Sequence, residues 1–468
     1  MKRLRLLLAA GALLLLAGCF SQSADDLYAQ PKAPDDYLKL DERISEVLNA
    51  GGEYAAPLTG ELTQKVQLQD LDNDGVQEAI AFFRVTSDER QLKICIYRET
   101  EDDYELAATI ESAGTAINAV AYRDLDDIPG KEIVVGWQQS DRLYSLAAYS
   151  IHNDQVVELM RTEYAAYQIC DLDLDGTDEI VVLHTGTGEG AKRAELYDYR
   201  EGVMEVASSA PLSRSVTALA ENGVHTGQLR GGEPAVFVDA AYSSAGYAPG
   251  EELGAFNTTA YSGDGQITDI FAWKDGALQN ITLDPATGES DSTIRWYTAV
   301  SARDINRDGI LELPDPYALP DPTSSSIAVN FWAIRWMQYD IDGAAELVYT
   351  TYYNDRDGWY FILPESWEGQ ITVSRSDVAG GERAVIFSHW EADSDESPQA
   401  FLAIYALSGD NRYMRANLTG RFRLTPVGAG DDVIYAARLI QGGWDCGLDE
   451  EGVRANFALI PSSWSYET

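Results

Sequence analysis

Short apolar runs recur along most of the chain, and turns rich in Gly, Asp and Asn separate them. KVQLQDL, QLKICIYRE, LYSLAAYSI and AELYDYR are typical of these runs. Segments of this length that are rich in β-branched and aromatic residues and bounded by turn residues predict β-strands. We therefore expect a mainly β fold in which about four strands form each structural unit.

Two segments have helical spacing instead. DDYLKLDERISEVLN, which begins at Asp35, places apolar residues on one face, and Gly51-Gly52 follows it. Near the C-terminus, LDEEGVRANFALIPSSW places Val453, Phe457 and Ile460 roughly on one face. Apolar residues at this spacing predict amphipathic helices. We expect a short helix before the first strands and a closing helix at the end of the chain.

An acidic segment recurs between predicted strands. DLDNDGVQE at 70–78 has counterparts in DLDDIPGKE at 124–132, DLDLDGTDE at 171–179, DINRDGILE at 304–312 and QYDIDGAAE at 338–346. All five end in Glu at the ninth position. A further segment, QLRGGEPAVFV, keeps the apolar run and lacks the acids. Repeats at intervals of roughly 50 residues, with four strands each, are typical of β-propellers or repeat arrays.

The residue types in these segments suit calcium. Ca²⁺ takes six to eight oxygen ligands, and carboxylates at positions 1, 3 and 5 converge when a loop curls. Glycine at position 6 permits the sharp turn, and position 9 adds a last carboxylate. Three segments have an oxygen donor at each position, so we predict structural Ca²⁺ sites there; the alternative is a set of Asx-rich turns. The predicted ligands are Asp70, Asp72, Asp74 and Glu78; Asp171, Asp173, Asp175 and Glu179; and Asp304, Asn306, Asp308 and Glu312.

The other segments depart from this pattern. The segment at 124–132 has Ile128 at the fifth position and its glycine at Gly130, and the segment at 338–346 begins with Gln338 instead of an acid. The pattern does not favour a metal at 124–132, and we expect weak binding at 338–346 and no binding by the acid-free segment. An EF-hand would need Glu at position 12, where Ala81 and Val182 stand instead, so that interpretation fails.

The N-terminus has the pattern of an export signal. MKRLR is basic, LLLAAGALLLLAG is apolar, and the run is too short for a spanning helix. Leu16-Ala17-Gly18-Cys19 resembles the lipobox of bacterial lipoproteins. That resemblance implies cleavage before Cys19, lipidation of Cys19, and a lipid-anchored protein on the extracytoplasmic face of the cell membrane. The alternative is an ordinary secretory signal.

Together these motifs resemble a known family. The acidic segments are similar to the FG-GAP/VCBS repeats of integrin-alpha-type β-propellers, whose calcium loops run D-x-D-x-D-G-x-x-[DE] between two strands of a blade. The resemblance covers roughly residues 55–350. It implies an integrin-alpha-like β-propeller of seven or six blades, with seven favoured. The order of the motifs, together with the lipobox in front of them, also resembles VCBS-repeat lipoproteins of Gram-positive bacteria.

The charge of the chain and the motifs that it lacks narrow the range of possible functions. The 468 residues include 34 basic and 76 acidic side chains, a net charge of −42, which excludes nucleic acid as a partner. Cys95 and Cys170 lie in apolar runs, and no CxxC pair indicates zinc. Gly186–Ala191 matches G-x-G-x-x-[GA], but a strand-like segment follows it, which predicts a hairpin. No motif of a hydrolase or metalloprotease surrounds the histidines, which are His152, His184, His225 and His389.

We divide the chain into four parts: a signal peptide at 1–19, a tether and helix at 20–52, a propeller at 53–354 and an α+β domain at 355–468. Alternatively, the first strands after 355 complete a last blade. The preferred hypothesis is a cell-surface lipoprotein whose calcium-stabilised propeller binds a protein or glycan. The alternatives are a polysaccharide hydrolase or lyase on a propeller scaffold, and a structural scaffold of an envelope complex.

Overall fold

The computed structural model describes residues 35–100, 103–126, 128–152, 155–184, 192–243, 265–320, 331–378, 380–390, 397–426, 432–442 and 444–460. The predicted signal peptide and Cys19 lie outside these ranges. Among the described residues, no helix is long and apolar enough to cross a membrane.

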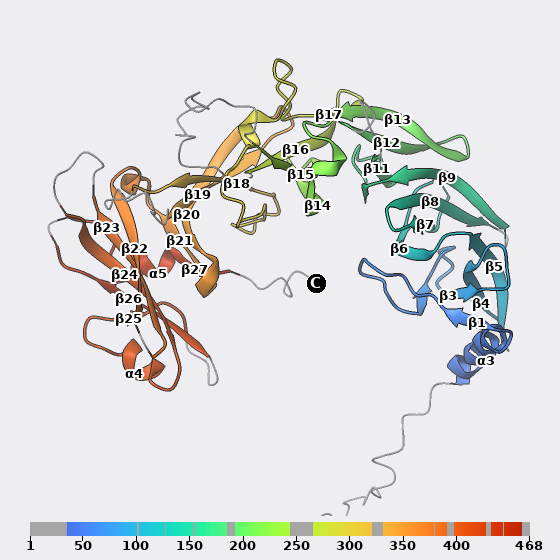
Figure 1. The fold of residues 1–468 in the computed structure, drawn as a ribbon, viewed down its shortest axis with the longest axis horizontal. Coiled ribbons are helices and arrows are strands. Elements are labelled where there is room, and N and C mark those ends of the chain that lie inside the picture. Colours follow the sequence, from blue (N-terminus) through green and yellow to red (C-terminus); the bar gives the residue numbers. More distant parts are fainter. Residues whose placement is uncertain are drawn as a thin grey trace, which may run out of the picture. The chain divides into compact units, whose positions relative to one another are not determined.

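The described strands form six sheets, and each sheet is built chiefly from strands that follow one another in sequence and pair antiparallel (Figure 1). The first sheet contains β1 (Gly52–Tyr54), β2 (Val66–Gln69), β3 (Glu78–Val85), β4 (Leu92–Glu99) and β5 (Tyr104–Ser112). The second contains β6 (Ala116–Arg123), β7 (Glu132–Ser140), β8 (Leu143–His152) and β9 (Gln155–Tyr164). The third contains β10 (Ala166–Cys170), β11 (Glu179–Leu183), β12 (Arg193–Arg200) and β13 (Val203–Pro211).

The other three sheets follow in order. They are β14 (Leu219–Gln228), β15 (Pro234–Tyr242), β16 (Gly265–Lys274) and β17 (Ala277–Asn280); β18 (Leu313–Ala318), β19 (Trp332–Tyr339), β20 (Ala345–Asn354) and β21 (Trp359–Leu363) with β27 (Phe457–Leu459); and β22 (Ile371–Val378), β23 (Glu382–His389), β24 (Gln399–Ser408) and β26 (Val433–Leu439) with β25 (Phe422–Arg423). The mainly β prediction is confirmed. Ring closure and blade number stay predictions.

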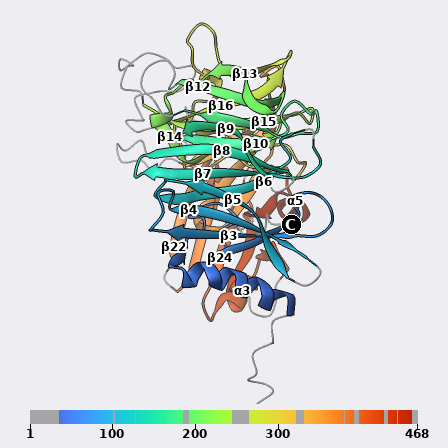
Figure 2. The ribbon, with the colours of Figure 1, turned by 90° about the vertical axis from the view of Figure 1, so that its right-hand side faces the viewer.

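The chain divides into two compact units. The smaller one runs to Tyr122 and includes Trp137–Gln139 and Ile151–Val157. Its helix α3 (Asp35–Asn49) lies against the sheet that contains β3, β4 and β5 (Figure 2). Leu40 and Ile44 are buried there against Phe83 and Tyr104. The predicted N-terminal helix is therefore confirmed, and burial of its apolar face accounts for its position.

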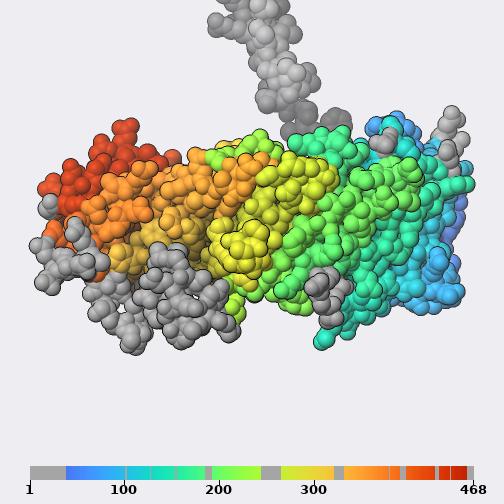
Figure 3. Space-filling model, turned by 90° about the horizontal axis from the view of Figure 1, so that it is seen from above, coloured from blue at the N-terminus to red at the C-terminus, as the bar shows by residue number. Residues whose placement is uncertain are grey.

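In the larger unit, the sheets follow the order of the sequence across the surface, from green β10–β13 through yellow β16 and β17 to orange β20 and β22 (Figure 3). An aromatic core joins its last two sheets. Trp367, 1% exposed, contacts Phe401 with ring centroids 4.8 Å apart, and its indole N–H donates to the Cys446 carbonyl at 2.9 Å. Burial of such large rings supplies much of the apolar stabilisation of a domain.

The C-terminal part differs from the sequence prediction at its closing helix, and its first strand pairs with the strand before it. The expected boundary between residues 354 and 355 falls in the turn between β20 and β21, which pair with each other, and β27 pairs with β21. The predicted closing helix is wrong beyond residue 455: α5 (Glu450–Ala455) is short, and Phe457 lies in β27. Backbone pairing with β21 outweighs the local helical spacing there.

Candidate calcium sites in the acidic loops

Three acidic loops share one backbone form. In each, the ninth residue is a buried glutamate that opens the next strand or lies directly before it, and its carboxylate accepts a hydrogen bond from the backbone N–H of the second residue. The donor–acceptor distances are 2.9 Å from Leu71 to Glu78, 2.7 Å from Leu172 to Glu179 and 2.8 Å from Ile305 to Glu312. Because the second residue is also buried, this bond fixes the glutamate side chain at the base of the loop.

The turn geometry explains the glycine at position 6. Gly75, Gly176 and Gly309 have φ of 90°, 104° and 88°, a region that disfavours side chains. The first aspartate of each loop accepts a hydrogen bond from the N–H of that glycine, and the loop curls around it. These distances are 3.0 Å for Asp70 and Gly75, 3.2 Å for Asp171 and Gly176, and 2.9 Å for Asp304 and Gly309.

The loop at 171–179 brings all four predicted ligands together. Asp171, Asp173, Asp175 and Glu179 each offer a carboxylate oxygen within 4.8 Å of the others. The other two loops bring three acids together at the same separation: Asp70, Asp72 and Glu78, and Asp304, Asp308 and Glu312.

The two remaining predicted ligands make hydrogen bonds inside their own loops. Asp74 accepts from the Val76 N–H at 2.7 Å. Asn306 donates its side-chain amide to Asp308 at 2.7 Å. Oxygen ligands crowded in this way are the donor set that calcium prefers.

Electrostatics at these loops favour a bound cation. Glu179 is 1% exposed, and its Oε1 has no hydrogen-bond partner among the described residues. Burial raises the pKa of Glu179 to about 8 and that of Glu312 to about 7, and neighbouring aspartates add to both shifts. Burial also raises the pKa of Glu78. A carboxylate held in this way is unfavourable as an anion unless a positive charge joins it.

A residue on the neighbouring strand lies opposite the glutamate of each loop, and the sequence pattern does not identify it. The register pairs Ala79 with Tyr97, Ile180 with Tyr197 and Leu313 with Met337. Because the strands are antiparallel, the glutamate just before each of Ala79, Ile180 and Leu313 lies opposite the residue just after its partner on β4, β12 or β19. These residues are Arg98, Asp198 and Gln338. Their separation from the loop in sequence differs because the intervening hairpins differ in length, so no fixed spacing marks them.

The side chains of these three residues differ in charge and in the groups that they contact. Arg98 Nε lies 3.9 Å from Glu78 Oε1, and its Nη2 lies 3.8 Å from Asp72 Oδ2. Gln338 Nε2 donates to Glu312 Oε1 at 2.7 Å and to Asp308 Oδ2 at 2.8 Å. Asp198 pairs with the Arg200 Nε at 3.2 Å. The residue opposite the ninth-position glutamate is therefore a cation in the first sheet (Arg98), an anion in the second (Asp198) and a neutral amide in the third (Gln338).

The segments at 338–346 and 124–132 have other partners. Gln338, taken from the sequence as the start of a fifth loop, instead contacts the loop at 304–312, and Asp340 pairs with Arg230 at 2.8 Å. In the segment at 124–132, Asp126 and Glu132 are buried, and the hydroxyl of Ser150 lies within hydrogen-bonding distance of both carboxylates. His152 offers a ring nitrogen within 4.8 Å of the same two acids, so these three residues could also hold a metal ion.

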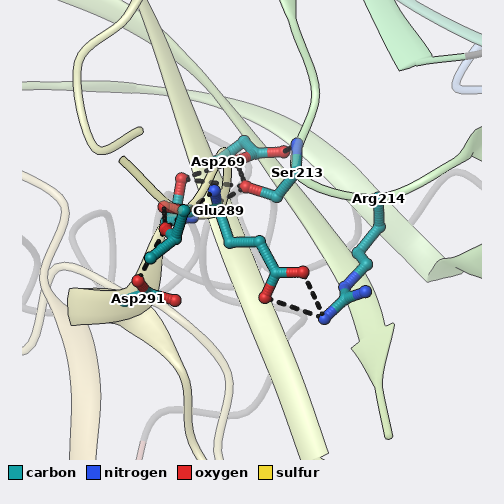
Figure 4. Close-up of polar contacts among 7 residues, drawn as sticks. Ser213, Arg214, Asp269, Glu289 and Asp291 are labelled. Atoms are coloured by element: carbon teal, nitrogen blue, oxygen red, sulfur yellow. Dashed lines mark hydrogen bonds and ion pairs between the residues drawn. The ribbon is translucent and has the colours of Figure 1, made fainter. Parts of the chain in front are cut away.

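A buried polar cluster surrounds Asp269 of β16, and no sequence motif marks it (Figure 4). Asp269, 1% exposed, accepts hydrogen bonds from the Ser213 N–H at 2.8 Å, the Ser290 hydroxyl at 2.6 Å and the Asn280 amide at 2.8 Å. Arg214 and Glu289 form an ion pair beside it. Because the carboxylate is satisfied from within, the cluster fixes the segments around β16 to one another.

Three histidines have partners within the sheets. His184 lies 2.8 Å from a Glu195 oxygen, His225 stacks on Phe237, and His389 stacks on Trp444 with centroids 4.8 Å apart. The G-x-G-x-x-[GA] match lies outside the described residues. The strands on either side of it, β11 and β12, pair antiparallel, which is hairpin topology.

The chain has only weak similarity to known proteins. No protein-family model matches the chain, and no curated protein matches it. Solved structures with partial similarity include the exotype rhamnogalacturonan lyase YesX, at 13% identity and a TM-score of 0.29 over 70% of this chain and 60% of that one. Another is the rhamnogalacturonan lyase YesW, at 14% identity and a TM-score of 0.28 over 70% of this chain and 59% of that one. The chain thus spans about 60% of the length of these structures, and similarity at this level says nothing about activity.

Proposed function

We propose that this chain is a calcium-stabilised β-repeat lipoprotein, anchored through Cys19 on the extracytoplasmic face of the membrane, whose sheets form an integrin-alpha-like propeller that binds a protein or glycan. The observation that carries the calcium part is the loop at 171–179. Four carboxylates converge there, and one of them, on Glu179, is buried with an oxygen that has no hydrogen-bond partner in the described part of the chain.

The fit to calcium follows from the donor set. All four side chains supply hard oxygen ligands, and no nitrogen or sulfur ligand of the kind that selects zinc is among them. Bound there, the ion would neutralise the mutual repulsion of the carboxylates. It would also hold the end of β10 to the start of β11, because its ligands come from the loop between these strands. Its binding energy would then appear as folding energy.

A binding role is supported by how several of the described polar groups are used. The loop acids are accounted for by cation binding, Asp269 is satisfied by internal donors, and His184, His225 and His389 have partners within the sheets. Antiparallel repeat sheets of this kind commonly present ligand-binding surfaces through their loops.

Thermal unfolding of the full chain tests the proposal. We expect EDTA to lower Tm and added Ca²⁺ to restore it, with an affinity of about 10⁻⁴–10⁻³ M, the range of extracellular sites. At a hundredfold excess over Kd, one such site stabilises by about 2.7 kcal/mol.

Asp171→Ala should remove part of this calcium response. The exposed turn residue Asp141 provides the matched control, Asp141→Ala, which should keep the whole response. Melting curves that are the same in EDTA and in calcium would refute the proposal. Recovery of a partner from envelope extracts in calcium but not in EDTA would support the binding role.

A further inference from the structure

The acidic loops resemble one another in sequence, but their surroundings carry different charges. The side chain that faces the position-9 glutamate from the neighbouring strand is Arg98 in one sheet, Asp198 in the second and Gln338 in the third. A unit charge a few ångströms from a metal ion changes its binding strongly, because the interaction falls only with the first power of distance and of the local dielectric constant.

Arg98 places a positive charge beside the acids that a metal ion would neutralise in the first loop. Its guanidinium lies within 4 Å of both Asp72 and Glu78, which are two of the three acids that converge there. Glu78 is 3% exposed, so its charge is poorly solvated and depends on a nearby positive group. The guanidinium of Arg98, whose side chain is 36% exposed, supplies a positive charge there without a metal ion.

At the other two loops the facing residue is not a cation. At 171–179, the facing residue Asp198 is a carboxylate that pairs with Arg200, and Arg123 pairs with Asp178 at the eighth position of the loop. Neither arginine is paired with Glu179, whose Oε1 has no hydrogen-bond partner among the described residues. At 304–312, Gln338 donates its amide nitrogen to Asp308 and Glu312, and the same amide turned about its last bond would present an oxygen instead. The positive, neutral and negative residues thus form a graded series.

We propose that this cross-strand residue decides which acidic loops take calcium, and that Arg98 is an internal cation that replaces the metal at residues 70–78. Affinity then decreases from the loop at 171–179 to that at 304–312, and the loop at 70–78 stays without metal. The inference rests on the proposed function, because it concerns calcium at the same loops. In this proposal Arg98 is not a metal ligand; it decides whether the loop at 70–78 binds calcium.

Calcium titration of the metal-stripped full chain by calorimetry tests it. In a parent that carries Asp171→Ala and Asp304→Ala, adding Arg98→Gln should strengthen calcium binding about tenfold or more, since a positive charge leaves the site. Arg98→Lys keeps the positive charge and should leave calcium binding as it is in the parent. Arg161→Gln is the matched control, because Arg161 is as exposed as Arg98, at 37% against 36%, and pairs with Glu158 instead of an acidic loop.

A second titration keeps the inference testable if the Arg98 variants do not fold. Asp70→Ala in the otherwise native chain should leave the number of bound calcium ions unchanged, whereas Asp171→Ala should lower it by one. Loss of an ion in Asp70→Ala, or equal affinities with and without Arg98 in folded protein, would overturn the inference. A native chain that binds no calcium at all would instead refute the proposed function.

Discussion

Removal of calcium should make the stability of this protein strongly dependent on pH, and Glu179 is the main reason. Its pKa is about 8 in the folded, metal-free chain, because the carboxyl is buried and lies beside Asp173 and Asp175; the ordinary value is 4.5. The folded state therefore holds a proton that the unfolded state releases at lower pH. Stability is highest below the ordinary pKa and falls as the pH rises towards 8.

The magnitude follows from the size of the shift. One pKa unit corresponds to about 1.4 kcal/mol, so raising the pH from about 5.5 to about 8 should lower the free energy of unfolding by roughly 3 kcal/mol through Glu179. Glu312, with a pKa of about 7, adds roughly 2 kcal/mol in the same direction. The pKa of Asp308 is lowered from 3.8, so the stability it contributes is lost only in more acidic solution.

Urea unfolding in EDTA, followed by tryptophan fluorescence at several pH values, measures this dependence. We expect Glu179→Gln to flatten the profile, because glutamine still accepts the hydrogen bond from Leu172 and carries no charge to bury. Glu205→Gln changes an exposed glutamate of the same sheet and should leave the profile unchanged. Saturating calcium should also flatten the wild-type profile. A metal-free protein that is equally stable at both pH values, or more stable at the higher one, would show that Glu179 is not held as the structure indicates.

Two further substitutions test the packing of the larger unit. Asp269→Ala should lower the free energy of unfolding by about 3–5 kcal/mol, since it leaves the buried donors of Ser213 and Ser290 without their acceptor, whereas the exposed Asp410→Ala should change it little. Trp367→Ala should cost about 3–5 kcal/mol by opening a cavity in the aromatic core, and Trp367→Phe should cost less. Urea midpoints measure both, and a loss below about 1 kcal/mol for either alanine variant would contradict the packing described.

The acidic loops were readable from the sequence because their chemistry is local. Four carboxylates and a glycine lie within the nine residues at 171–179, and the backbone hydrogen bonds that curl the loop join residues at most seven apart. The strands could be predicted for the same reason: each apolar run is short and bounded by turn residues. The helix α3 has its amphipathic pattern and its terminating glycines within one continuous segment.

Only the tertiary structure decided which residues face these loops. Arg98, Asp198 and Gln338 reach the position-9 glutamates because strand register aligns them, and register depends on hairpins of unequal length. In the same way, Phe457 belongs to a strand because β21 offers it a backbone partner that its neighbours in sequence cannot supply. The sequence by itself thus determined where cations can be bound, through ligands that are close along the chain. The charge that surrounds each loop was decided by pairing between distant segments, which no local pattern encodes.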